Sequence, residues 1–261
     1  MLGTVKAIYL ATRKKHDQLF NTYLMRPLAA GVVAILAPTP ITPNQLTLLN
    51  LFIFVVAAAL FAVMPGYLGG VIGAAVLELS YLFDCTDGML ARHKKIASKE
   101  GHLFDFFTDE GKAVMLAGAL AIRLYRGGGL GIGFGLTLWP AGTPAFLYAG
   151  IAGTVILASG ISLTNFVRRP EISGNAVTVE AFYETQAQGP KRSLVGRVAG
   201  LAFTFLRFLN HYPSHIWIFA LAGRLDAFFW IYVAINLLYL ARGWLGLVVR
   251  FGRFPKAPTS T

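Results

Sequence analysis

The residues of this chain that are best suited to chemistry are four aspartates in two regularly spaced pairs. The whole chain has only 12 acidic residues. Asp84 and Asp87 are three positions apart, and Asp105 and Asp109 are four positions apart. Either spacing places both carboxylates of a pair on one face of a helix. Two such faces brought together would form an oxygen-rich site for a hard divalent cation, which indicates metal-assisted phosphoryl transfer.

The elements that must position these aspartates are apolar helices in a membrane. The 261 residues are 56% hydrophobic and 13% charged, whereas about 25% charged residues is usual in a soluble domain. The formal net charge of +11 would suit nucleic acid if the chain were soluble. Here the basic residues flank apolar stretches, so we expect no nucleic-acid partner. The single cysteine, Cys85, excludes an intrachain disulfide, and basic residues interrupt the N-terminal segment, so we expect no cleavable signal peptide.

Apolar stretches along the chain predict an all-α, polytopic membrane protein with six transmembrane helices. Thr42 can cap the first helix, with Pro43 in its first turn. Most stretches approach the roughly 20 residues that are needed to cross a bilayer. Gly127–Gly142 is expected to be a glycine-rich connection, and Pro213 either enters or kinks the fifth span. The spans lie near residues 46–64, 67–83, 101–122, 145–167, 200–223 and 225–249.

The N-terminal segment, residues 1–41, mixes basic and apolar positions and is too polar to span. We expect an amphipathic helix there, lying on the cytoplasmic membrane interface. The six-helix catalytic domain then covers residues 42–250, with a cytoplasmic loop at about 168–197, and residues 251–261 form a C-terminal tail. Six spans place both termini on one side, and the excess of basic residues there assigns that side, with the four aspartates, to the cytoplasm.

A longer pattern surrounds the aspartates and resembles the signature of the CDP-alcohol phosphotransferase (CDP-alcohol phosphatidyltransferase) family. The pattern is Asp84-x-x-Asp87-Gly88-x-x-Ala91-Arg92, eight residues, then Gly101-x-x-x-Asp105-x-x-x-Asp109. Thr42-Pro43-Asn44 and Thr47 also resemble the segment that begins the first span in that family. The resemblance covers residues 42–249 in architecture, and residues 42–47 and 84–109 in specific motifs.

The resemblance implies an activity and a role for individual residues. Members of the family transfer a substituted phosphate from a CDP-linked alcohol to the hydroxyl of a second alcohol and release CMP, with Mg²⁺ or Mn²⁺ as the cofactor. Asp84, Asp87 and Asp105 would hold the metal. Asp109 would take the proton of the acceptor as the catalytic base and could also contact a second metal ion. The nucleotide and its diphosphate would lie against Asn44, Thr47, Asp87, Gly88, Ala91, Arg92 and Gly101.

Several substrates remain compatible with this motif. The expected donor is CDP-diacylglycerol, in phospholipid biosynthesis, and the alternative within the family is a soluble donor such as CDP-inositol or CDP-choline with a lipid or polyol acceptor. Arg168, Arg169 and Arg192 are candidates to bind an anionic acceptor, or they attract anionic membrane lipids. A cation-coupled transporter is the alternative of a different class, although transporters more often carry their charges at the membrane midplane.

The oligomeric state is a further expectation. Small residues in the fourth span, among them Gly150 and Gly153, would allow close helix contacts within the chain or between two chains. Because the resemblance also suggests two subunits, we expect a homodimer.

Overall fold

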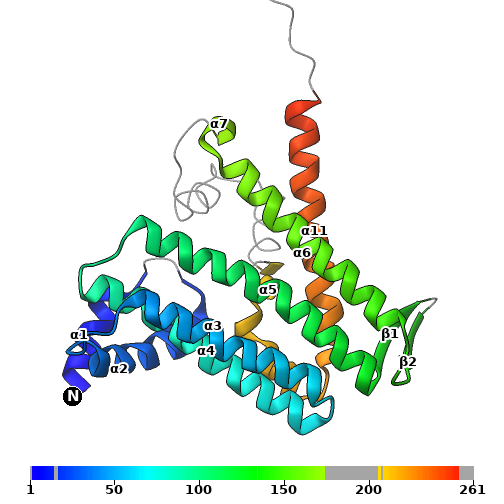
Figure 1. Cartoon of the computed structure of the whole chain (residues 1–261), viewed down its shortest axis with the longest axis horizontal. Coiled ribbons are helices and arrows are strands. Elements are labelled where there is room, and N and C mark those ends of the chain that lie inside the picture. Colours follow the sequence, from blue (N-terminus) through cyan, green and yellow to red (C-terminus); the bar gives the residue numbers. More distant parts are fainter. Residues whose placement is uncertain (1, 15–16, 134, 174–204, 207, 253–261) are drawn as a thin grey trace, which may run out of the picture.

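The computed structural model describes residues 2–14, 17–133, 135–173, 205–206 and 208–252. Over these residues the chain folds mainly into long helices (Figure 1). Helices α3 (Pro43–Val63), α4 (Tyr67–His93) and α5 (Lys99–Gly127) lie side by side, and α6 (Ala145–Arg168) packs on α5. A mainly helical, apolar architecture is therefore what the sequence predicted.

The first helical pair shows how local sequence sets the arrangement. Thr42 accepts a hydrogen bond from the backbone N–H of Gln45, and the Gln45 side chain accepts one from the backbone N–H of Thr42. This capping box, with Pro43 in the first turn, fixes the start of α3. Further along, a Cβ at Gly73 of α4 would lie 2.8 Å from the ring of Phe61 of α3. Glycine at this position lets α3 and α4 approach each other closely.

Helix α5 begins at Lys99, two residues before the predicted start at Gly101. The reason is Ser98, whose side chain accepts a hydrogen bond from the backbone N–H of Gly101 and so caps the helix. The second half of α5 lies in the main apolar core, between α3 and α6. Its buried residues there are Leu116, Ala117, Ala119, Leu120, Ala121 and Leu124.

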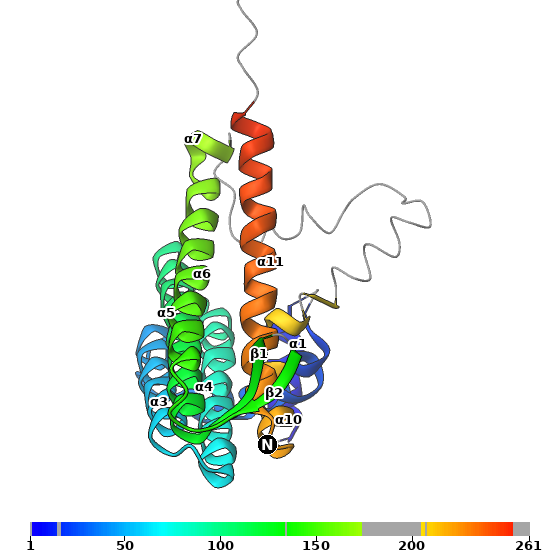
Figure 2. The ribbon, with the colours of Figure 1, turned by 90° about the vertical axis from the view of Figure 1, so that its right-hand side faces the viewer.

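The glycines of α6 serve contacts inside the chain. A Cβ at Gly150 would lie 2.3 Å from the Cβ of Ala121 in α5. A Cβ at Gly153 would lie 2.9 Å from the side chain of Val233 in α11 (Leu225–Phe251). Figure 2 shows α6 and α11 standing side by side along much of their length. These two glycines therefore explain packing within one chain and give no support to a dimer.

The N-terminal segment differs from the single amphipathic helix that the sequence predicted. It contains α1 (Leu2–Thr12), a π-helical turn (Asn21–Met25) and α2 (Arg26–Leu36). Asp17 lies between α1 and that turn and accepts hydrogen bonds from the backbone of Gln18 and from the side chains of Asn21 and Arg26. Such local side-chain bonds compete with a continuous helix. Apolar side chains of both helices pack against α4 in a second core that includes Ile8, Met25, Ala29, Ala30, Val33, Cys85, Met89 and Leu90.

The predicted glycine-rich connection is an antiparallel β-hairpin, so the fold is not purely helical. Strand β1 (Gly129–Gly133) pairs with β2 (Gly135–Trp139). Its sequence alternates small and large residues with the period of a strand, a signal that was available in the sequence. A Cβ at Gly131 would lie 1.9 Å from the indole of Trp139, so glycine makes room for that ring. The indole of Trp230 in α11 donates to the carbonyl of Leu130 at 2.6 Å and holds the hairpin on the helices.

Four of the described helices, α3, α4, α6 and α11, are long and apolar enough to cross a membrane. They correspond to the predicted first, second, fourth and sixth spans. Helix α5 matches the third span in position and has 29 residues, but charged residues crowd its first half. The predicted fifth span lies partly outside the described residues, and its remainder holds a short 3₁₀ helix (Tyr212–Ser214) and α10 (Ile216–Leu221). Pro213 therefore marks an entry into α10 rather than a kink within a long helix.

Candidate metal and phosphoryl-transfer site

The carboxylates converge where the C-terminal half of α4 meets the N-terminal half of α5. Asp84, Asp105 and Asp109 each offer one oxygen, and these three oxygens lie within 4.8 Å of one another. Asp84 is carried by α4, and the other two are carried by α5. Side chains that are 21 and 25 positions apart in sequence are thus brought together because α4 and α5 both pack on α3.

Asp84 is held from two sides. The side-chain amide of Asn50 in α3 donates to its Oδ1 at 2.8 Å, and the ammonium of Lys112 donates to the same oxygen at 2.7 Å. Asn50 is fully buried and is itself oriented by Ser80, whose hydroxyl donates to the Asn50 side-chain oxygen at 2.6 Å. The site is therefore built on three helices and not on the two that carry the motif.

Lys112 and Asn50 are site residues that the sequence reasoning missed. Besides Asp84, the Lys112 ammonium contacts Asp109 Oδ1 at 2.6 Å, and the Lys112 side chain is only 3% exposed. The sequence does contain a signal for Lys112, because this residue is three positions after Asp109 and seven after Asp105 and therefore lies on the same face of α5. Asn50 is likewise three positions after Thr47 on α3. A buried lysine in this cluster balances part of its negative charge.

Asp87 is not one of the three residues whose oxygens lie within 4.8 Å of one another. It lies one turn further along α4 and is 2% exposed, and its Oδ2 accepts a hydrogen bond from the hydroxyl of Thr47 at 2.7 Å. Thr47 and Asp87, which were both predicted to lie against the nucleotide, are therefore hydrogen-bonded to each other. Asp87 still has a second carboxylate oxygen, and its i, i+3 spacing keeps it on the face of α4 that carries Asp84.

Asp105 supplies the observation that tests whether the site suits a metal. Among the described residues, its Oδ1 is buried and has no hydrogen-bond partner within the protein. A buried carboxylate oxygen without a partner is costly. A cation bound between Asp105 and its neighbours would satisfy that oxygen, and carboxylate oxygens are the ligands that Mg²⁺ and Mn²⁺ prefer. The donor set therefore fits a hard divalent cation.

The residues predicted to cradle the nucleotide line the same region of α3, α4 and α5. A Cβ at Gly101 would lie 3.2 Å from the side-chain oxygen of Asn44, so glycine permits the starts of α3 and α5 to meet. A Cβ at Gly88 would meet only the Arg92 side chain, at an ordinary 3.5 Å, so packing within the chain does not require glycine there. Ala91 is partly exposed. The guanidinium of Arg92 donates through Nε to the carbonyl of Thr12 at 2.9 Å, which ties the motif to the end of α1.

Of the three arginines predicted to bind an acceptor, the structure describes Arg168 and Arg169. Arg168 ends α6 and stacks over the ring of Phe106, 4.6 Å from its centre, one residue after Asp105. Arg169 is exposed just beyond that helix. Arg192 lies outside the described residues. Arg168 is thus held close to the segment that carries Asp105.

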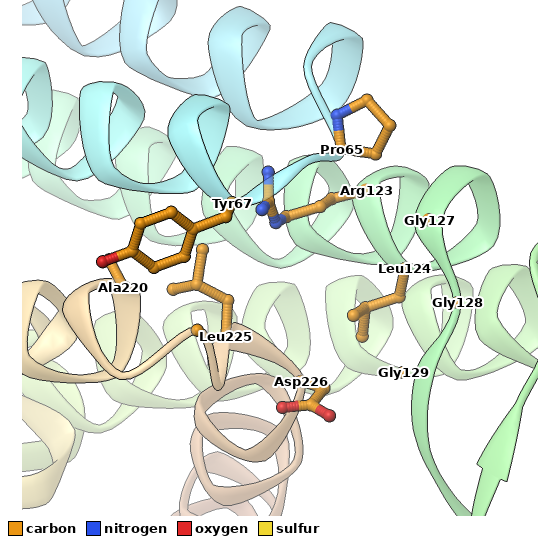
Figure 3. A pocket seen from close by; sticks show the side chains of 11 residues that line it. Pro65, Tyr67, Arg123, Leu124, Gly127, Gly128, Gly129, Ala220, Leu225 and Asp226 are labelled. Atoms are coloured by element: carbon orange, nitrogen blue, oxygen red, sulfur yellow. The ribbon is translucent and has the colours of Figure 1, made fainter.

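A cavity lies at the opposite end of the helices. It has a volume of about 240 Å³ and is lined by Tyr67, Arg123 and Asp226, among others (Figure 3). Tyr67 precedes Asp84 by 17 residues on α4, which is about 25 Å along a helix. The Arg123 guanidinium donates to the carbonyls of Met64 and Gly66 and so closes the α3–α4 turn. This cavity is therefore separate from the carboxylate site.

A comparison with known families agrees with this geometry. A family model described as CDP-alcohol phosphatidyltransferase matches residues 40–181, which is more than half of the 261-residue chain. The matched range contains α3 to α6 and all four aspartates. No curated protein matches the chain. The extent of the match, and the aspartates that it encloses, show that the chain belongs to the CDP-alcohol phosphatidyltransferase family.

Proposed function

We propose that this protein transfers a phosphatidyl group from CDP-diacylglycerol to the hydroxyl of an alcohol, with release of CMP and in dependence on Mg²⁺ or Mn²⁺. The family is a class of transferases that act on CDP-alcohols, and it uses divalent metals. The observation that carries the proposal is the convergence of Asp84, Asp105 and Asp109 within 4.8 Å, with one buried oxygen of Asp105 left without a partner.

The metal would be held by Asp84, Asp87 and Asp105. Each has a carboxylate oxygen that is not committed to the hydrogen bonds described above, so each can contribute a ligand without breaking the contacts to Asn50, Lys112 or Thr47. A bound Mg²⁺ or Mn²⁺ would neutralise the diphosphate of the donor and stabilise the charge that develops on CMP.

Asp109 is the proposed general base. Its side chain is 46% exposed, much more than the 17% of Asp84, so an acceptor alcohol can reach it. The acceptor oxygen forms a bond to the phosphorus as the bond from phosphorus to the CMP oxygen breaks. The hydroxyl proton passes to the Asp109 carboxylate. A base in this position typically contributes about 10²–10⁴-fold in rate.

The other motif residues would receive the nucleotide. Gly88 supports this role because only the Arg92 side chain lies beside it, so that a ligand can approach the backbone next to a guanidinium. Asn44, Ala91 and Gly101 border the same region, and Thr47 would orient Asp87 toward it. Arg92 has a planar guanidinium that can meet a phosphate in two places, although its Nε is committed to Thr12.

The acceptor side and the membrane placement are also proposals. We infer that residues 42–250 form the catalytic unit, that the carboxylate site opens to the cytoplasm, and that lipid chains enter from the bilayer. Arg168, beside Asp105 through Phe106, is the arginine best placed to attract an anionic acceptor, with Arg169 and Arg192 as further candidates. A homodimer remains a prediction, and crosslinking in bilayers that gave only monomer would contradict it.

The experiment is a screen for CMP release by the purified chain in lipid nanodiscs. The first arm supplies CDP-diacylglycerol with inositol, inositol phosphate, glycerol phosphate, serine, choline or ethanolamine. The second arm supplies CDP-inositol or CDP-choline with lipid acceptors and tests the alternative donor class. We expect release in one arm, abolished by EDTA and by Asp105→Asn. The matched control is Glu100→Gln, which changes an exposed carboxylate in the first turn of the same helix.

Two results would contradict the proposal. Release of CMP that continues in EDTA would exclude the metal, and full activity in Asp105→Asn would exclude the carboxylate site. If neither arm releases CMP while the protein binds Mn²⁺ and carries a cation flux across the bilayer, the transporter alternative replaces the transferase.

A further inference from the structure

The feature of this site that the motif does not explain is the lysine inside it. Lys112 is buried, with its ammonium 2.7 Å from Asp84 Oδ1 and 2.6 Å from Asp109 Oδ1. Lys112 thus bridges Asp84, a proposed metal ligand on α4, and Asp109, the proposed base, which lies on α5 together with Lys112 itself. Lys112 itself lies three residues beyond the last position of the motif.

The position of the ammonium limits what else can bind there. Lys112 occupies one oxygen of Asp84 and one oxygen of Asp109, so a divalent ion that bridged these two carboxylates would have to use their other oxygens and would lie close to the ammonium. A second cation placed beside the ammonium would also repel it, and this repulsion is strong in a buried site, where water screens charges poorly. By contrast, Asp105 Oδ1 has no hydrogen-bond partner among the described residues and is available as a ligand to one ion.

We propose that Lys112 is a built-in counter-cation that takes the place of a second metal ion, so that this chain binds one divalent cation. This inference rests on the proposed function and deepens it. Lys112 acts as a positioning residue: it fixes the Asp109 carboxylate for the acceptor hydroxyl and keeps Asp84 and Asp109 close when no metal is bound. Asp84, Asp87 and Asp105 then hold the single ion.

The test counts Mn²⁺ ions bound by the full chain in nanodiscs, by electron paramagnetic resonance of the free ion. We expect one Mn²⁺ per wild-type chain. Lys112→Met keeps the length and apolar stem of the side chain but removes its charge, and we expect it to bind two Mn²⁺ ions. We also expect Lys112→Met to unfold at a lower temperature than wild type in EDTA, and to gain more than wild type when Mn²⁺ is added. Lys99→Met, at an exposed position of the same helix, is the matched control and should leave all three values unchanged.

Several outcomes would overturn the inference. The count for the wild-type chain needs no variant, and two ions there would refute it even if Lys112→Met failed to fold. If Lys112→Met bound one Mn²⁺ ion, or gained no more stability than wild type when Mn²⁺ is added, Lys112 would be only a structural ion-pair partner and the inference would be wrong. If wild type binds no Mn²⁺ and releases no CMP from any CDP-alcohol, the proposed function has failed. If it binds Mn²⁺ and releases CMP but Lys112→Met shows no change, only this inference has failed.

Discussion

Asn50 offers the sharpest test of how the fold supports the site, because it contacts Asp84 but lies outside the motif. Its amide donates to Asp84 Oδ1 at 2.8 Å, and its own oxygen accepts from Ser80 at 2.6 Å. Asn50→Leu has a similar volume and leaves little cavity, so the loss should come from these two hydrogen bonds. A bond to a charged group is worth about 1.5–3 kcal/mol and a neutral one about 0.5–1.5 kcal/mol. We therefore expect a loss of stability of about 2–4 kcal/mol.

The effect on catalysis should be larger than the effect on stability suggests. Without Asn50, Asp84 loses its contact with α3, and a displacement of about 1 Å at a catalytic centre can cost roughly 10²-fold in rate. Ser80→Ala is the matched control, because it removes the hydroxyl but leaves the bond from Asn50 to Asp84 in place. We expect Ser80→Ala to lose much less activity than Asn50→Leu.

The assay combines thermal unfolding in EDTA, followed by tryptophan fluorescence, with metal-dependent CMP release. The expected order of activity is wild type, then Ser80→Ala, then Asn50→Leu. If Asn50→Leu unfolded at the wild-type temperature and kept its activity, the view that α3 positions Asp84 would be wrong. If both variants lost the same activity, the loss would reflect general damage to the α3–α4 packing.

The remaining predictions concern other parts of the same structure. Asp109→Asn should keep CDP affinity but lose most turnover, whereas Asp87→Asn should lose both; equal CDP affinity in the two variants would contradict this division of roles. Arg123→Met should cost about 3–6 kcal/mol, because two charge-assisted bonds to the α3–α4 turn disappear, but should leave the KM for CDP-alcohol unchanged. Burial of Asp17 alone would raise its pKa, but the charge of Arg26 and the hydrogen bonds at Asp17 hold that pKa below its ordinary value. The stability from this pair is therefore present above the unfolded pKa of about 3.9 and disappears as the pH falls through the folded pKa. Asp17→Asn should be less stable than wild type at pH 7, and a gap in unfolding temperature that stayed constant down to pH 3 would disprove the assignment.

The motif predicted the site as far as residue type and spacing can. The i, i+3 and i, i+4 pairs lie on α4 and α5 as expected, and three of the four aspartates offer converging oxygens. The sequence could not predict that Asp87 turns to Thr47, because that contact depends on where α3 lies. Asn50 could not be predicted either, since a single asparagine in an apolar stretch has no partner until the helices are packed. Lys112 could have been predicted in part, because its spacing from Asp109 is visible in the sequence, but its contact with Asp84 depends on the packing.

The fold was predicted unevenly for similar reasons. Long apolar stretches with strong caps, such as the one that begins at Thr42, became helices close to the predicted limits. The hairpin of β1 and β2 was not predicted, because a high glycine content is typical of irregular connections. The alternation of small and large residues in it nevertheless has the period of a strand. The N-terminal segment was expected to be one helix, and the contacts of Asp17 divide it.

What the sequence determined by itself was local: helices of a given length, carboxylates on given faces, and a family motif. These depend on neighbours within about one turn, so residue order is sufficient. Only the tertiary structure decided which charges meet. The ammonium of Lys112 contacts both Asp84 and Asp109, and the amide of Asn50 donates to Asp84, because the packing of α3, α4 and α5 brings these side chains together. Electrostatic energies change steeply with distance, so the charge balance of the site is a property of that packing.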